Sequence, residues 1–155
     1  MTLLTPERFL DIMEKTPRIL ERTLHGISQQ QAETLTDGPD GWSVLIVVCH
    51  LHNYAEIFME RANFMIEHSG EHLPNYDHLA LIEQNRYREQ DMRRILAEFK
   101  ERRAKLLAWF RERTAAEWNL GAKHDRFGYI TLLDLAMHIG WHDINHIDQI
   151  AKSIK

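Results

Sequence analysis

Apolar side chains recur every three or four residues along most of the chain, with polar residues between them. This period is that of an amphipathic helix with one face toward a core, so it predicts helices and no strand. Four helices are predicted, at residues 6–25, 43–68, 77–113 and from residue 131 to the carboxyl end. Residues 27–41 and 114–130 are polar or rich in turn-forming residues and are predicted to be long connections.

The first predicted helix has signals at both ends and one inside. Thr5 can cap it, Pro6 suits its first position, and Gly26 can stop it. Pro17 lies in its middle, where the ring removes a backbone donor and clashes with the preceding turn. We therefore expect the first helix to be kinked or interrupted near Pro17.

The fourth predicted helix begins at a capping box, because Thr131 and Asp134 stand three residues apart at the start of an apolar pattern. Four helices of this length around one core make an all-α four-helix bundle. No linker divides residues 1–155, so a single domain is expected. The long connections 27–41 and 114–130 permit crossovers instead of a simple up-and-down bundle.

Composition limits the classes of function. The formal net charge is −4, whereas a surface that binds nucleic acid is normally basic. The longest purely apolar run, residues 44–49, is far shorter than the roughly 20 residues that span a bilayer, and no signal peptide is recognisable. Cys49 is the one cysteine, which excludes an intrachain disulfide and fits a reducing compartment. We expect a cytoplasmic protein without nucleic-acid or membrane partners.

Histidine is the candidate for chemistry. His138, His142 and His146 follow one another at intervals of four residues in the fourth predicted helix. Four residues advance a helix by about 400°, so neighbours in this series lie one turn apart on one face. Two such imidazoles can bind a common ion if another helix supplies a further ligand. His50 stands in an apolar stretch of the second predicted helix, where an imidazole without a partner is costly.

Spacing alone leaves alternatives open. A histidine on a helix is more often a hydrogen-bonded core or surface residue than a ligand, and His138 shares a face with His142. His52 lies about 200° around the helix from His50, and Cys49 about 100°, so neither is expected to join a site with it. The remaining cluster, His68, His72 and His78, lies in a polar connection and is expected to be solvated.

Several segments resemble one known family. Trp-Ser-Val at residues 42–44, with His50 eight residues after the Trp, resembles the opening of the second helix in DinB-like proteins. Residues 141–150, WHDINHIDQI, resemble that family's last-helix signature H-D-x-x-H-x-x-Q-I. Residues 85–91 and 128–132 also resemble the family, so the similarity covers nearly the whole chain.

This resemblance implies a four-helix bundle with crossover connections and a metal site formed by His50, His142 and His146. His138 falls outside the family's ligand positions, so we expect it in the core or behind the ligands. Asp143 and Gln149 can each accept a ligand's second N–H and so fix its tautomer, although ordinary helix-surface polarity explains them equally well.

Three neutral imidazoles leave a coordination position open, as in catalytic zinc sites. They suit one divalent ion of Zn, Ni, Co or Fe. The resemblance implies a metal-dependent enzyme: a thiol-dependent S-transferase or a hydrolase that acts on small electrophiles in stress response or detoxification. No catalytic side chain can be named. The alternatives are a non-catalytic metal-containing protein that binds or sequesters a small molecule, and a purely structural histidine cluster. Relatives of this kind also lead us to expect a homodimer.

Overall fold

Four long helices form the frame of the molecule, as predicted. The structure is a computed structural model that describes residues 2–155. The helices are α1 (Pro6–Thr23), α3 (Val44–Glu67), α5 (Met92–Arg111) and α6 (Leu132–Ser153). Each begins after a residue whose side chain accepts a backbone N–H of the first turn: Thr5, Ser43, Asp91 and Thr131. The predicted all-α bundle is confirmed, and so are the caps at Thr5 and Thr131.

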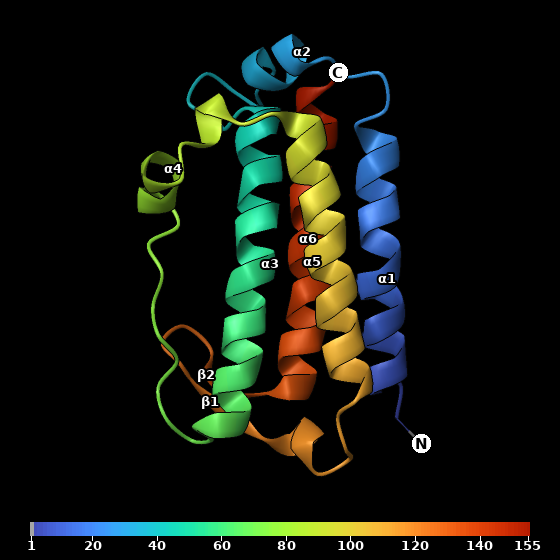
Figure 1. Ribbon diagram of the computed structural model, residues 1–155, viewed down its shortest axis with the longest axis vertical. Helices are drawn as coiled ribbons and strands as arrows, with labels where there is room; N and C mark the ends of the chain where they lie inside the picture. Colours follow the sequence, from blue (N-terminus) through green and yellow to red (C-terminus); the bar gives the residue numbers. More distant parts are fainter. Residues whose placement is uncertain (1) are drawn as a thin grey trace.

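The bundle does not have a simple up-and-down order. Helices α1 and α6 run in one direction, and α3 and α5 run in the other (Figure 1). Each long helix packs against two others: α1 and α3 both contact α5 and α6. Helices α1 and α3 are therefore diagonally opposite, as are α5 and α6. The connection between α3 and α5 returns along the length of the bundle (Figure 1).

The single helix predicted over residues 77–113 is wrong, because the structure divides this segment into three pieces. These are α4 (Ala80–Gln84), a 3₁₀ turn (Tyr87–Glu89) and α5. The break lies at Arg86, whose φ of 50° is left-handed and cannot continue an α-helix. Buried apolar side chains occur on both sides of the break, so the helical pattern of the sequence runs through it.

The start of α5 provides a direct test of this correction. Asp91 accepts the backbone N–H of Arg94 at 2.8 Å. Asp91→Ala should lower the free energy of unfolding by about 1 kcal/mol, because it removes the N-terminal cap. Urea denaturation measures this loss. Glu101→Ala, at an exposed position within α5, is the control and should change the value by less than about 0.5 kcal/mol. Equal effects of the two changes would contradict a helix start at Asp91.

The predicted connections contain structure that the sequence pattern did not reveal. Residues 27–41 include a short helix, α2 (Gln29–Thr34). Residues 114–130 include a 3₁₀ turn (Glu117–Asn119) and most of an antiparallel hairpin.

The hairpin consists of β1 (Gly121–His124) and β2 (Gly128–Thr131), so the expectation of a chain without strands is wrong. Each strand has four residues, and burial does not alternate along either of them, so the sequence carries no strand period. The returning connection is attached to this hairpin, because Leu73 donates its N–H to the carbonyl of Lys123 at 2.9 Å. The next residues of that connection are thereby held beside α3.

Of the kink or interruption expected near Pro17, the interruption does not occur, because α1 continues through this residue. Proline has no N–H, so the carbonyl of Met13 loses its usual partner four residues later. Arg103 of α5 donates a hydrogen bond from Nη1 to that carbonyl at 3.0 Å. A neighbouring helix therefore satisfies the acceptor that the proline leaves free.

A buried polar layer separates two groups of apolar core residues. Arg103 donates two hydrogen bonds to the carboxylate of Asp143, at 2.5 and 3.0 Å, and the side chains are each 2% exposed. Thr16 donates its hydroxyl to the same carboxylate. This layer joins α1, α5 and α6 next to the histidines of α6. Among residues 2–155, no helix is both long and apolar enough to cross a membrane.

Candidate metal centre

Three histidines meet between α3 and α6. Helix α6 presents His142 and His146 one turn apart, and α3 presents His50 opposite them. Each imidazole offers one nitrogen, and these nitrogens all lie within 4.8 Å of one another. The Nε2 atoms of His50 and His142 are 3.0 Å apart. The structure thus brings together the three residues that were predicted as ligands, as a group that can hold a metal ion.

Burial keeps these imidazoles neutral, which is the form that binds metals. It lowers the pKa of His50 to about 3, with further lowering by His146 and His78. Burial also lowers the pKa of His142 well below its ordinary value, and the neighbouring histidines add to this effect. The pKa of His146 is lowered by burial as well, although its hydrogen bond to Gln149 opposes the shift.

Gln149 orients one of the three rings. Its Oε1 lies 2.9 Å from His146 Nδ1, so it accepts that N–H and leaves Nε2 of His146 with a lone pair. Gln149 therefore accepts the second N–H of a candidate ligand, which was the role considered for it. The Nδ1 atoms of His50 and His142 are buried without a hydrogen-bond partner among residues 2–155.

Asp143 does not accept an N–H from a candidate ligand, which was the role considered for it. Its carboxylate accepts hydrogen bonds from Arg103 and Thr16, and none from the three imidazoles in the described part of the chain. Its side chain points toward α1 and α5 because a buried arginine there requires an anion. The carboxylate acts on the site only through space, since it raises the pKa of His146.

His138 lies outside the group of three. Its ring centroid is 6.0 Å from that of His142, and the rings of Phe58 and Phe127 lie 5.9 and 5.6 Å away. Burial lowers the pKa of His138 to about 4, and the positive charge of Arg61 contributes. His138 is thus a neutral ring packed among aromatic side chains, one turn before the first candidate ligand of α6.

Two neighbours of His50 also stay outside the group. His52 Nε2 contacts Glu98 of α5 at 2.9 Å. Cys49 Sγ lies 3.7 Å from the carbonyl oxygen of Tyr87, and burial raises the pKa of this thiol to about 12. Cys49 is therefore a poor candidate for a nucleophile or a thiolate ligand.

The three histidines open into a cavity of about 460 Å³. Trp42 stacks on His146 with ring centroids 6.3 Å apart, and Tyr54 lies 4.4 Å from His50 by the same measure. Sequence reasoning did not identify several of the residues that line this cavity, among them Tyr54, Arg61, His78 and Phe127.

His78 was expected to be solvated like His68 and His72. All three are exposed, but His78 borders the cavity, with its ring centroid 6.3 Å from that of His50. The connection between α3 and α5 passes over the candidate centre, which brings this residue there. The sequence carries no signal of that placement, because it depends on the path of a connection.

Comparison with known proteins supports this architecture. A family model described as the DinB superfamily matches residues 12–150. Among solved structures, YfiT from Bacillus subtilis is similar, with a TM-score of 0.87 and 22% sequence identity over 97% of this chain and 86% of that chain. YfiT is described as a probable metal-dependent hydrolase with an unusual four-helix bundle topology. At this identity the likeness establishes the fold. No curated protein matches the chain.

Proposed function

Because the chain belongs to the DinB superfamily, we propose that it is a metal-dependent enzyme whose ion is held by His50, His142 and His146. The observation that carries this proposal is the convergence of three neutral imidazole nitrogens within 4.8 Å on the wall of a cavity. The donor set fits a divalent ion of Zn, Ni, Co or Fe. Three protein ligands leave room for a small molecule, and the cavity provides access to it.

An ion in this place supplies Lewis acidity, which lowers the pKa of a bound water or thiol and yields a nucleophile near neutral pH. The side chains of the protein determine the surroundings. Gln149 holds His146 in one tautomer, at 2.9 Å from its Nδ1. Trp42 and Tyr54 cover the imidazoles with aromatic surface and so exclude water from one side.

We further propose that the reaction joins a low-molecular-weight thiol to a small electrophile or hydrolyses such an electrophile, in stress response or detoxification. In the first case the thiol sulfur forms a bond to carbon, the leaving group departs with the bonding electrons, and the thiol proton goes to solvent. A cavity of about 460 Å³ is in the size range of sites for small molecules. The similarity to YfiT, which is described as a probable metal-dependent hydrolase, favours hydrolysis.

Turnover should depend on the metal. We expect protein loaded with Zn²⁺ or Ni²⁺ to conjugate at least one of bacillithiol, mycothiol, glutathione and cysteine to monochlorobimane, or to hydrolyse p-nitrophenyl acetate. Chelation should reduce either rate at least about tenfold, because the nucleophile is no longer activated. Fluorescence and absorbance measure the two reactions. Circular dichroism should show unchanged helix content, because the two apolar core groups support the bundle.

If neither assay shows turnover, the absorption spectrum of Co²⁺-loaded protein distinguishes two interpretations. If thiols also leave the absorption spectrum of Co²⁺-loaded protein unchanged, the enzyme proposal is contradicted. A spectrum that changes without turnover supports a protein that binds or sequesters a small molecule.

We also propose that the chain forms homodimers through α1 and α6. These two helices pack side by side and present large apolar side chains to solvent: Ile12, Ile19, Met137, Trp141 and Ile144. Apolar surface of this kind is typical of an interface between copies. Sedimentation equilibrium at micromolar concentration should give twice the chain mass of 18.4 kDa. A species of 18.4 kDa alone would exclude the dimer.

A further inference from the structure

Two arginines are buried among residues 2–155, and their surroundings differ. Arg103 is 2% exposed, and its two terminal nitrogens donate to the carboxylate of Asp143, the hydroxyl of Thr16 and the carbonyl of Met13, whereas its Nε has no partner in this part of the chain. Arg61 of α3 is 8% exposed and makes no ion pair or hydrogen bond within the described part of the chain. Its guanidinium lies over the ring of Tyr76, with the guanidinium carbon 5.6 Å from the ring centroid.

The carboxylates that line the same cavities, and the one that contacts Tyr76, have other partners. Glu60 accepts the hydroxyl of Tyr76 at 2.5 Å, and Asp125 accepts a hydrogen bond from Asn75. Asp134 is engaged by Thr131 at the start of α6. A buried cation without an anion is unfavourable, and folded proteins usually pair it. Arg103 follows this rule through its pairing with Asp143. Arg61 departs from it, because no anion pairs with it in the described part of the chain.

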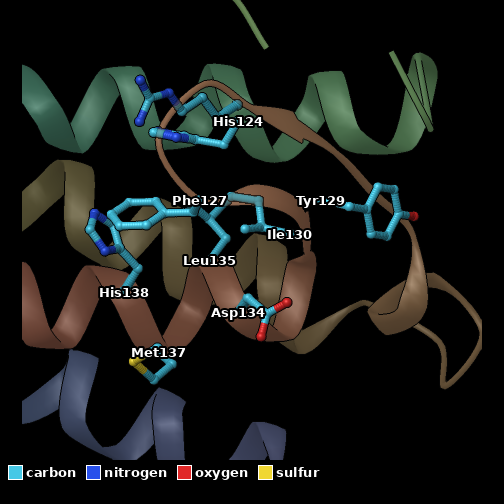
Figure 2. Close-up of a pocket in the computed structure, with 9 residues that line it drawn as sticks. His124, Phe127, Tyr129, Ile130, Asp134, Leu135, Met137 and His138 are labelled. Carbon is cyan, nitrogen blue, oxygen red and sulfur yellow. The ribbon is translucent and has the colours of Figure 1, made fainter. Parts of the chain in front are cut away.

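Arg61 faces open space. It lines the cavity of about 460 Å³ that contains the three histidines, and also an adjacent cavity of about 300 Å³. The two cavities share Arg61, His124, Phe127 and His138. Figure 2 shows the smaller one, where the ring of Phe127 lies between His124 and His138.

The position of Arg61 along α3 relates it to the candidate metal centre. Arg61 follows His50 by eleven residues, which places it on the same face of the helix and about 16 Å farther along the axis. The same cavity is thus lined by the three candidate ligands and by an unpaired guanidinium. A molecule that contacts both carries an anionic group apart from its reacting atom.

We propose that Arg61 binds an oxyanion group, a carboxylate or a phosphate, of a small molecule that reaches the three histidines. The guanidinium offers a planar fork of donors that matches either group. Burial strengthens this pairing because little water competes for the charge. The identification of this molecule as the substrate rests on the proposed function, whereas binding of the oxyanion does not. The proposed substrate class is therefore an anionic electrophile or an anionic thiol.

Calorimetric titration with three probes of similar shape tests the assignment: benzoate, phenyl phosphate and neutral benzamide. At least one of the two anions should bind about ten- to a hundredfold more tightly than benzamide, as for a hydrogen bond to a charged group. The tighter anion identifies which oxyanion the site takes. Each titration is made with Zn²⁺-loaded and with chelated protein, because a carboxylate can also bind a metal. We expect the preference for the anion in both forms.

Arg61→Met should abolish this preference, and Arg61→Lys should keep part of it, because lysine retains the charge without the fork. Arg93→Met is the control: Arg93 is exposed on α5, lines neither cavity and should not affect the preference. Thermal unfolding checks that Arg61→Met folds, and we expect a raised Tm because the variant no longer buries an unpaired charge.

The proposal is overturned by tight benzoate or phenyl phosphate binding in Arg61→Met, by equal binding of benzamide, or by failure of all three probes to bind. Loss of the preference on chelation would instead show that the metal captures the anion, and would also overturn it. Absence of metal or of turnover in the wild-type protein contradicts only the proposed function, because the chelated protein still reports on Arg61.

Discussion

Replacing His50, His142 or His146 by alanine is expected to strip the protein of its divalent metal, whereas His138→Ala should leave the metal bound. The three candidate ligands have nitrogens within 4.8 Å of one another, and His138 is not part of that group. A site with three protein ligands has no spare donor, so each single loss should lower metal affinity at least as much as loss of an outer contact does, about 10- to 100-fold.

Elemental analysis after dialysis measures this effect, and wild-type protein should contain close to one divalent ion per chain. His138→Ala is a stringent control, because its ring lies 6.0 Å from that of His142 on the same helix face. A wild-type protein without metal would contradict the proposed centre. Loss of metal in His138→Ala together with its retention in His50→Ala would show that the ligands are assigned wrongly.

The second large effect concerns stability. Asp143→Ala should lower the free energy of unfolding by about 3–5 kcal/mol, because it leaves the guanidinium of Arg103 buried without its anion. Both side chains are 2% exposed, and two hydrogen bonds join them. Urea denaturation measures the loss. A cost of this size is a large part of the total stability of a small protein.

A surface ion pair is the control for this experiment. Lys15 and Asp11 are 2.6 Å apart in α1, but each side chain is 54% exposed. Asp11→Ala should therefore cost less than about 1 kcal/mol. The double variant Arg103→Met with Asp143→Leu should recover much of the loss, since it buries no charge. A loss of less than about 1 kcal/mol in the free energy of unfolding for Asp143→Ala would mean that the buried polar layer contributes little to stability.

The sequence by itself determined the features that depend on neighbouring residues. The helical period, the caps at Thr5 and Thr131, and the placement of His138, His142 and His146 on one helix face all follow from positions within one or two turns. Such features can be recognised because helix geometry relates residue number directly to direction. The resemblance to the DinB-like family selected His142 and His146 from this series and joined His50 to them, a choice that no local pattern makes.

Tertiary structure decided what depends on residues far apart in the chain. Arg103 satisfies the carbonyl that Pro17 leaves free, and the same guanidinium binds Asp143, which therefore does not reach the candidate ligands. The connection that carries His78 passes over the cavity, and no helical or strand period specifies its path. The lack of an anionic partner for Arg61 in the described part of the chain likewise depends on tertiary structure. Whether a buried charge finds a partner depends on which helices pack together, and only the folded chain determines that.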